Sequence, residues 1–437
     1  MTQPARPIRP TQPIQVVVIG GGYAGVMAAN RLTGNDGLAV TLVNPRPEFV
    51  ERIRLHQLIS GTGDAVVPFR DVLAARVRLV VGTVSRIDPA ARALTLTGGD
   101  AAHPGPDDGP HTLPYDYLVY AVGSTATDLG VPGVAEFAHP VAALEDARRL
   151  RPLLDATPVS APVTVVGAGP TGLETAAELA ESGRRVTLVC GGPLGPYLHP
   201  RGRRSTARQL AALGVQILEG PGSRVTAVTA DTVRLADGRV LPSRLTLWTA
   251  GLGVPELARR SGLSTDAIGR LLTDETLTSV DDERIIAAGD SAAPSGAPYR
   301  MSCQAAVQLG PQAAETVLSR IAGRTPAPVA AGFAGQCVSL GRRAGIIQLA
   351  RRDDRALRLH VRGRFAARIK EFVCRSTVKQ LAYEARKPGA RDLWAKDGRR
   401  AERLRRAGAT AATAATGADP AAAPGQEEAS PTPLTPR

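Results

Sequence analysis

Along this chain, short unbroken runs of apolar residues alternate with stretches that have helical spacing. Four runs are rich in Val, Ile and Leu and short enough to be strands buried in a parallel sheet: 15–19, 38–43, 163–166 and 186–189. After a glycine-rich turn, the first and third runs are followed by segments with the spacing of a helix, 24–32 and 173–181. The order of strand, turn, helix and strand occurs twice and predicts an α/β fold with parallel sheets.

The first glycine-rich turn reads Gly20-Gly21-Gly22-Tyr23-Ala24-Gly25, a G-x-G-x-x-G motif. Gly20 allows the sharp turn, Gly22 leaves room for a pyrophosphate, and Gly25 lets the helix pack closely on the strand. The helix beyond the turn presents free N–H groups and the positive end of its dipole to a diphosphate. A single copy of this motif is also compatible with a plain glycine turn.

A second copy of the motif strengthens the interpretation of the first as a dinucleotide-binding turn. It reads Gly167-Ala168-Gly169-Pro170-Thr171-Gly172 and has the same strand before it. Each copy is paired with a later run that closes in glycine, Tyr115–Gly123 for the first and Leu245–Gly251 for the second. The arrangement predicts two nested Rossmann-like units and therefore two bound dinucleotides.

Gly289-Asp290 follows a further short apolar run and is expected to start a helix. An aspartate there can accept a hydrogen bond from a ribityl hydroxyl, or it can simply cap the helix. Asn44 ends the second run, where this motif usually has an acid for the ribose, and Arg54 lies in an expected helix at 51–57. Arg54 is either close to a flavin or its phosphates, or part of a solvated helix face.

Composition narrows the class of protein. The net charge of +13 is concentrated in residues 351–406, which hold 19 Lys and Arg against 7 Asp and Glu, so we expect an acidic partner such as phospholipid there. The four cysteines form neither a C-x-x-C pair nor a zinc spacing, which argues against a disulfide scaffold and a metal site and favours a cytoplasmic setting. No run approaches the ~18 apolar residues of a membrane-spanning helix.

Together these features resemble the two-dinucleotide-binding-domain flavoproteins, and within them the type II NADH dehydrogenases and the apoptosis-inducing-factor-like NAD(P)H:quinone oxidoreductases. The likeness covers residues 15–381 and is strongest at GAGPTGLE, 167–174. MSCQAAVQ at 301–308 is similar to the A-Q-x-A-x-Q quinone motif of that family, with Cys303 replacing the first Ala. The resemblance implies FAD in the first unit and NAD(P)H in the second, with Glu174 beside the nicotinamide and Gln304 and Gln308 at the quinone entrance.

The expected cofactor contacts fall into two sets. For FAD they are Gly20, Gly22, Tyr23, Ala24, Gly25, Asn44, Arg54, Val84, Ala121, Gly123, Gly289 and Asp290, and for NAD(P)H they are Gly167, Gly169, Pro170, Thr171, Gly172, Glu174, Cys190 and Gly251. Cys190 stands where an NADH enzyme usually carries an acid, and an expected loop with Arg201, Arg203 and Arg204 follows. Both NADH and NADPH are therefore permitted.

The carboxyl-terminal part predicts a small α+β domain with strands in 337–350 and one amphipathic helix. Its apolar residues recur at helical steps and its basic residues lie elsewhere, the apolar set being Phe365, Ile369, Phe372, Val373, Thr377 and Leu381. Such a helix either lies on an anionic membrane surface or covers its own core or a dimer partner.

The resulting plan has a leader at 1–13, an FAD-binding domain at 14–125 and 256–325, an NAD(P)H-binding domain at 126–255, a C-terminal domain at 326–400 and a disordered tail at 407–437. We predict an FAD-dependent oxidoreductase that passes electrons from NAD(P)H to a quinone-like acceptor. Two alternatives are a reductase whose acceptor is a ferredoxin-type protein and a nucleotide-sensing protein that binds nucleic acid through 351–406.

Overall fold

The computed structural model describes residues 12–98, 111–390 and 396–407. The chain divides after Lys396 into two compact units, and the second contributes a short helical segment at 400–407. All elements below belong to the first unit. Within the described ranges, no helix is both long and apolar enough to cross a membrane. Most of the expected leader and tail lies outside those ranges.

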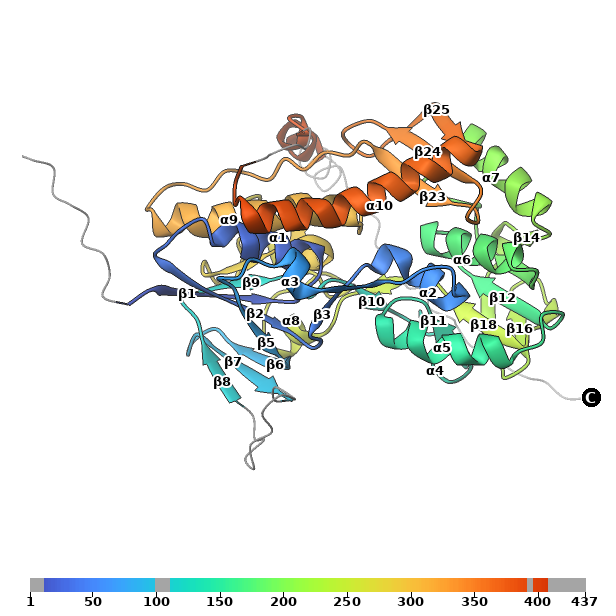
Figure 1. Cartoon of the computed structure of the whole chain (residues 1–437), viewed down its shortest axis with the longest axis horizontal. Coiled ribbons are helices and arrows are strands. Elements are labelled where there is room, and N and C mark those ends of the chain that lie inside the picture. Colours follow the sequence, from blue (N-terminus) through green and yellow to red (C-terminus); the bar gives the residue numbers. More distant parts are fainter. Residues whose placement is uncertain (1–11, 99–110, 391–395, 408–437) are drawn as a thin grey trace, which may run out of the picture. The chain divides into compact units, whose positions relative to one another are not determined.

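A parallel sheet with the strand order β21-β9-β1-β2-β5 forms the first nucleotide unit (Figure 1). Its strands, in chain order, are β1 (Ile14–Ile19), β2 (Leu38–Asn44), β5 (Arg78–Val81), β9 (Tyr117–Tyr120) and β21 (Ile285–Ala287). Because β21 follows the whole second unit in sequence yet pairs with β9, the chain returns to the first sheet. The two nucleotide units are therefore nested, as the sequence predicts.

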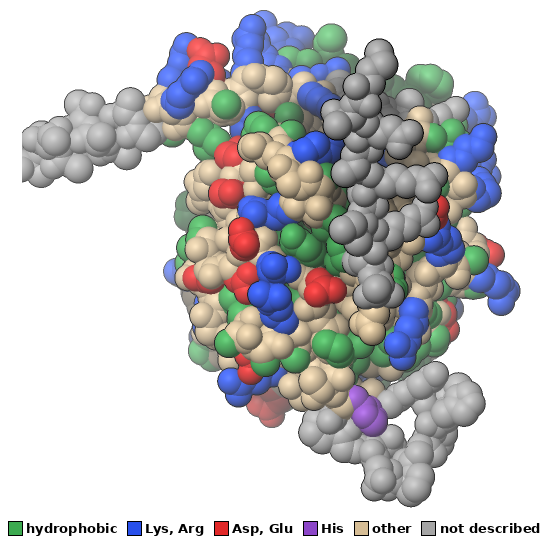
Figure 2. All heavy atoms as spheres, turned by 90° about the vertical axis from the view of Figure 1, so that its left-hand side faces the viewer, with side chains coloured by type: hydrophobic (Ala, Val, Ile, Leu, Met, Phe, Trp, Pro, Cys, Tyr) green, Lys and Arg blue, Asp and Glu red, His purple; other side chains and the backbone are tan. Residues whose placement is uncertain are grey.

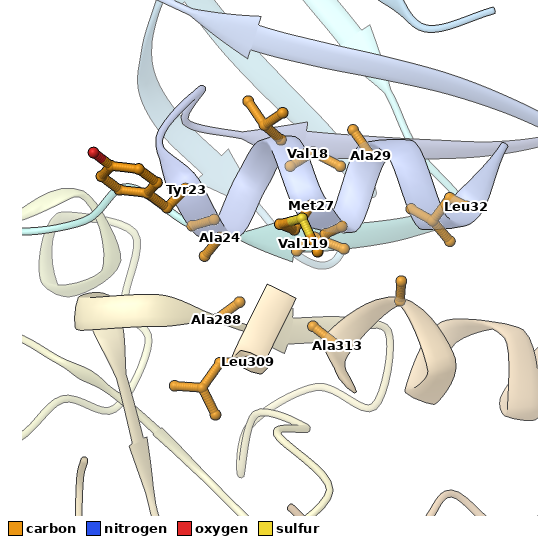
Figure 3. Packing of buried hydrophobic residues seen from close by; sticks show 14 of the residues in the cluster. Val18, Tyr23, Ala24, Met27, Ala29, Leu32, Val119, Ala288, Leu309 and Ala313 are labelled. Atoms are coloured by element: carbon orange, nitrogen blue, oxygen red, sulfur yellow. The ribbon is translucent and has the colours of Figure 1, made fainter. Parts of the chain in front are cut away.

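Helix α1 (Tyr23–Leu32) lies between this sheet and α9 (Cys303–Ile321). Figure 3 shows Ala24 and Met27 of α1 directed toward Leu309 and Ala313 of α9, and all four side chains are buried. A Cβ at Gly310 would lie 2.2 Å from the carbonyl oxygen of Ala24, so glycine is what allows the two helices to approach this closely. This contact places α9 against the first glycine turn.

The second nucleotide unit repeats the design with the order β11-β18-β12-β13-β14. Its parallel strands are β11 (Ala138–Pro140), β12 (Pro162–Val166), β13 (Arg185–Val189), β14 (Gln216–Leu218) and β18 (Leu245–Trp248), and its main helices are α5 (Leu144–Ala156), α6 (Pro170–Glu181) and α7 (Pro200–Ala212). Helix α6 starts before the predicted residue 173, since proline is favourable in the first turn of a helix.

Smaller elements complete the two units. The strands are β3 (Glu48–Val50), β4 (Val66–Pro68), β6 (Thr83–Asp88), β7 (Ala93–Thr97), β8 (His111–Pro114), β10 (Thr125–Ala126), β15 (Val225–Val228), β16 (Thr232–Leu235), β17 (Val240–Pro242), β19 (Leu252–Gly253), β20 (Leu271–Thr273) and β22 (Ala292–Pro294). The helices are α2 (Leu55–Ser60), α3 (Phe69–Val72), α4 (Val134–Phe137) and α8 (Leu257–Arg260). Strand β8 pairs antiparallel with β7.

The carboxyl-terminal part of this unit is an antiparallel sheet of β23 (Gly335–Ser339), β24 (Gly345–Ala350) and β25 (Ala356–Arg362), followed by α10 (Gly363–Arg386). Figure 1 shows α10 running from α1 toward β24, so one helix borders both nucleotide units. On the face at the left of Figure 1, basic and acidic side chains are interspersed with hydrophobic ones (Figure 2). That face therefore does not carry charge of a single sign.

The apolar residues of α10 do not share one environment. Thr377 and Leu381 are buried, but Phe365 and Phe372 are 63% and 70% exposed. Lys370 is buried instead. The helix therefore turns a polar residue toward the interior and two phenylalanines toward solvent.

Candidate functional site

A cavity of about 560 Å³, here called the central cavity, lies where the two nucleotide units meet the carboxyl-terminal sheet and α10. The first glycine turn contributes Gly22, Tyr23 and Ala24 to its wall. The second unit contributes Pro170, Thr171 and Glu174. The two motifs that the sequence singles out therefore face one shared space.

Both glycine turns are shaped by close backbone contacts. Gly20 has φ of +100°, and a Cβ there would lie 2.3 Å from the oxygen of Ala121, while one at Gly25 would lie 1.8 Å from the oxygen of Gly20. Gly167 and Gly172 repeat this geometry in the second unit. These positions accept only glycine, because any larger residue would displace backbone.

The middle glycine of each turn is different. A Cβ at Gly22 or at Gly169 would meet no heavy atom within 4 Å. Each helix N-terminus therefore faces open space, which suits an approaching diphosphate. The hydroxyl of Tyr23 and the Nε2 of Gln336, both on residues of the cavity wall, are buried without a hydrogen-bond partner in the described part of the chain. These groups fit a polar ligand in this cavity.

The strand ends expected to border a dinucleotide also line the cavity. They are Ala121, Gly123, Gly251, Gly289 and Asp290. Oδ1 of Asp290 accepts a hydrogen bond from the backbone N–H of Ser302, the N-cap of α9, at 3.1 Å. The helix expected directly after Asp290 is wrong, because a 3₁₀ turn, η3 (Gly289–Ser291), and β22 follow and α9 begins later.

Arg54 is not placed where the flavin hypothesis expects it. Its guanidinium donates two hydrogen bonds to Glu371, at 3.0 and 3.1 Å, and one to Glu51, and Arg54 is absent from the cavity wall. Arg52 lines the cavity in its place and donates to the hydroxyl of Ser124 at 2.9 Å. The alternative of a solvated face is also wrong, since Arg54 is buried.

Asn44, Val84 and Gln308 also lie outside the cavity wall. So do several glycines of the two turns and one cysteine: Gly20, Gly25, Gly167, Gly169, Gly172 and Cys190. Oδ1 of Asn44 accepts from the backbone N–H of Gly21 at 2.9 Å, so Asn44 stabilises the first turn. The Val84 side chain is buried in a hydrophobic core. Gln308 lies one helical turn beyond Gln304, and its amide bonds to both backbone groups of Gly332. Gln304 lines the cavity, and its amide accepts the backbone N–H of Ala334 and donates to the backbone oxygen of Gly335, both at 3.1 Å.

Cys190 directly follows β13 and lies near Glu219, which directly follows β14. Burial, with help from the Glu219 carboxylate, raises the pKa of Cys190 to about 12. A carboxylate therefore lies near the end of β13, although it comes from the residue after β14 and not from position 190. The three arginines at 201, 203 and 204 lie on helix α7 rather than on the expected loop.

The wall of the cavity also holds an ion pair that the sequence does not reveal. Nζ of Lys370 lies 3.0 Å from Oε1 of Glu174, and the same oxygen accepts the backbone N–H of Ser339 at 3.0 Å. Behind Glu174, His56 lies with Nδ1 3.6 Å from Oε2 of that carboxylate. These groups come from α10, α6, β23 and α2.

Burial and charge set the ionisation of this group. Burial acts to raise the pKa of Glu174, but Lys370, His56 and the Ser339 N–H hold it below its ordinary value. Burial acts to lower the pKa of Lys370, and Glu174 outweighs it, so that pKa is raised. Burial lowers the pKa of His56 to about 4. At neutral pH the cavity therefore holds a carboxylate, an ammonium and a neutral imidazole.

Three free cysteines, Cys303, Cys337 and Cys374, share the cavity wall although they are distant in sequence. Burial raises the pKa of Cys303 and of Cys337 to about 11, so both are thiols at neutral pH. Among the described residues, no group of three or more His, Cys, Asp or Glu is placed to hold a metal ion.

Apolar side chains border the cavity beside α10. Leu252, Leu349 and Val373 belong to its wall, and all three are partly exposed to solvent. Val373 is next to the exposed Phe372 on the helix. The cavity wall therefore includes partly exposed apolar side chains, one of them on α10.

Comparison with known proteins identifies relatives. The sequence matches the protein-family model described as pyridine nucleotide-disulphide oxidoreductase over residues 14–310. It is 30% identical over 366 residues to the type II NADH:quinone oxidoreductase Ndh of Mycobacterium tuberculosis, covering 73% of this chain and 75% of that protein.

Solved structures share the fold. NDH2 from Plasmodium falciparum, in complex with NADH, matches with a TM-score of 0.70 at 16% identity, covering 87% of this chain and 99% of that one. The sulfide:quinone oxidoreductase from Aquifex aeolicus matches with a TM-score of 0.70 at 19% identity, covering 85% and 92%. Together these matches confirm the α/β architecture with two nucleotide units.

Proposed function

Because the chain belongs to the pyridine nucleotide-disulphide oxidoreductase family, we propose that it is a flavoenzyme that oxidises NADH and reduces a quinone. The observation that carries this proposal is that both glycine turns face the central cavity, one from each nucleotide unit. Two dinucleotides held by these turns would bring their rings together there. The relative from Mycobacterium tuberculosis, named for this reaction, supports the choice of donor and acceptor.

The first unit would hold FAD. The diphosphate would lie at the N-terminus of α1 over Gly22, and Asp290 would accept hydrogen bonds from the ribityl chain. FAD supplies the hydride and electron chemistry, so the residues of the chain need only bind, orient and exclude water.

The second unit would hold the nicotinamide nucleotide at Gly169 and Pro170, with Glu174 near the nicotinamide. We favour NADH over NADPH because Glu219 puts a negative charge beside Cys190, where the adenosine ribose of this motif lies. A 2′-phosphate there would be repelled by the carboxylate. The arginines of α7 leave NADPH as a weaker substrate rather than excluding it.

A quinone would enter through the apolar border at Leu349 and Val373. Its carbonyl oxygens need hydrogen-bond donors, and the Lys370 ammonium in the wall is a strong one. The N–H of the Gln304 amide that does not bond to Gly335 would be the second donor in the same wall. An apolar entrance and two polar donors match a ring that has an apolar body and two carbonyl groups.

The exposed face of α10 supports contact with a membrane surface, where quinones are dissolved. Phe365 and Phe372 would enter the lipid, and Arg364, Arg368 and Arg375 on the same helix would meet anionic headgroups. This interpretation also gives the basic segment a partner without invoking nucleic acid.

The test uses the purified chain loaded with FAD. NADH oxidation should be fast with a short-chain quinone and slow with an acidic ferredoxin as sole acceptor. Turnover with ferredoxin but with no quinone would favour the alternative reductase. Salt-sensitive DNA binding without any NADH oxidation would favour the nucleic-acid alternative.

A further inference from the structure

His56 lies between two buried carboxylates on the side of Glu174 that faces away from Lys370. Its Nδ1 is 3.6 Å from Oε2 of Glu174, and its Nε2 is 3.4 Å from Oε2 of Glu178. The two glutamates are one turn apart on α6 and present their carboxylates to opposite nitrogens of the same ring. His56 itself is 2% exposed, so the ring has no direct access to solvent.

Glu178 is the member of this row of side chains that lies nearest to the surface. Its Oε1 accepts a hydrogen bond from the hydroxyl of Thr62 and lies 3.9 Å from Nε of Arg342. Thr62 and Arg342 are both exposed. Its Oε2, which faces His56, is buried and has no hydrogen-bond partner within the described residues. One oxygen of Glu178 therefore faces groups in contact with water and the other faces the imidazole.

The charges around the imidazole keep it neutral, so the ring is suited to transferring a proton and not to holding one. Two carboxylates of α6, Glu174 and Glu178, face His56. Three cations also act on the ring: Lys370 from α10, Arg342 from the β23–β24 turn and Arg54 from the segment just before α2. A further cation, Arg151 of α5, lies over Gly61 at the end of α2. Burial and these cations keep the ring neutral, and burial raises the pKa of Glu178 above its ordinary value. A neutral imidazole can accept a proton at one nitrogen while it donates one from the other.

We propose that His56 relays protons between Glu178 and Glu174 and so connects solvent at Thr62 and Arg342 to the central cavity. In one transfer, a proton leaves Oε2 of Glu178 for Nε2 as the Nδ1 proton leaves for Oε2 of Glu174, and the ring must then turn to restore its first tautomer. Both distances must shorten by a few tenths of an ångström during the transfer. Glu174 is then the donor on the cavity side, next to Lys370.

This inference rests on the proposed function, because the demand for protons depends on the acceptor. NADH, one proton and a quinone give NAD⁺ and a hydroquinone, so one proton must enter from solvent in each turnover. With ferricyanide, NADH reduces two Fe(III) ions to Fe(II) and one proton is released. The ratio of the quinone rate to the ferricyanide rate therefore isolates proton delivery from hydride transfer.

The experiment compares His56→Gln and Glu178→Gln with His360→Gln in the FAD-loaded full chain. Glutamine keeps a hydrogen-bonding side chain at each position but cannot relay a proton by changing tautomer. His360 is a matched control because it contacts Ser205 and is absent from the cavity wall. We expect the quinone-to-ferricyanide ratio to fall about tenfold in the first two variants and to stay within twofold in the control.

Two further measurements separate proton relay from a merely structural role. Added imidazole should restore the quinone rate of His56→Ala, and a pH indicator in weakly buffered solution should show slower proton uptake in a single quinone turnover of His56→Gln. Equal loss of both rates without rescue by imidazole would overturn the relay alone. A wild-type protein that oxidises NADH with ferricyanide but with no quinone would overturn the proposed function and the relay with it.

Discussion

Replacing Lys370 by methionine should destabilise the protein in a way that depends on pH. The Lys370–Glu174 separation of 3.0 Å corresponds to a Coulomb energy of about 5.5 kcal/mol at an effective dielectric constant of ~20. Desolvation of both groups cancels much of this energy in the intact pair. Methionine leaves the Glu174 carboxylate buried without its ammonium, for which losses of about 3 to 5 kcal/mol are typical.

The sign of the pH dependence follows from Glu174. In the wild type its folded-state pKa is below the ordinary value of 4.5, so the stabilisation is complete at neutral pH and is lost as pH falls below that value. In Lys370→Met, burial dominates and the folded-state pKa of Glu174 rises above the ordinary value. The unfolded chain then releases its proton first, so the stability of the variant falls as pH rises from 5 toward 8.

Calorimetry of the FAD-loaded chain at pH 5.5 and pH 8 measures this difference. The melting temperature of Lys370→Met should lie below that of the wild type at both pH values, with the larger deficit at pH 8. The double variant Lys370→Met/Glu174→Gln should recover part of the loss because no buried charge remains. Lys379→Met, an exposed lysine of the same helix, is the control. A deficit that is equal at both pH values would refute the reasoning.

Four other outcomes are expected. Gly22→Val, whose side chain would enter open space, should fold but bind FAD at least tenfold more weakly, about 1.4 kcal/mol, by titration of the apoprotein. Glu219→Gln should raise kcat/KM for NADPH relative to NADH severalfold, and an unchanged ratio would exclude Glu219 from selecting the nucleotide. Phe372→Glu should lower binding to anionic vesicles at least tenfold in a sedimentation assay, whereas Val159→Glu, also at an exposed apolar residue, should not. Because burial lowers the pKa of His56 to about 4, the unfolded state binds more protons between pH 6.5 and 4, so the wild-type melting temperature should fall over that range and fall less in His56→Gln.

The parts of the site that depend on local geometry could be predicted from the sequence. A glycine turn between a strand and a helix is fixed by neighbouring residues, and the structure shows why Gly20 and Gly25 must be glycine. The strand ends at Ala121 and Gly251 also reach the cavity, because within each of the two sheets the parallel strands end at the same edge.

The parts of the site that depend on residues distant in the sequence could not be predicted from the sequence. Apolar periodicity groups Phe365 and Phe372 with Leu381, yet the two phenylalanines are exposed and Leu381 is buried. Lys370 is buried because it pairs with Glu174, which lies on a helix of the second nucleotide unit. Arg54 is a candidate flavin contact from the sequence, but in the structure its guanidinium is hydrogen-bonded to Glu371 on α10. Such pairings are set by tertiary packing, and no local pattern encodes them.

The central claim is that both cofactors meet in the central cavity, so that hydride passes directly from one to the other. Anaerobic addition of NADH to the FAD-loaded chain, followed by stopped-flow absorbance, tests this claim most directly. We predict that the oxidised flavin spectrum bleaches within one turnover time and returns when a quinone is added. A bound flavin that stays oxidised under excess NADH would contradict the account.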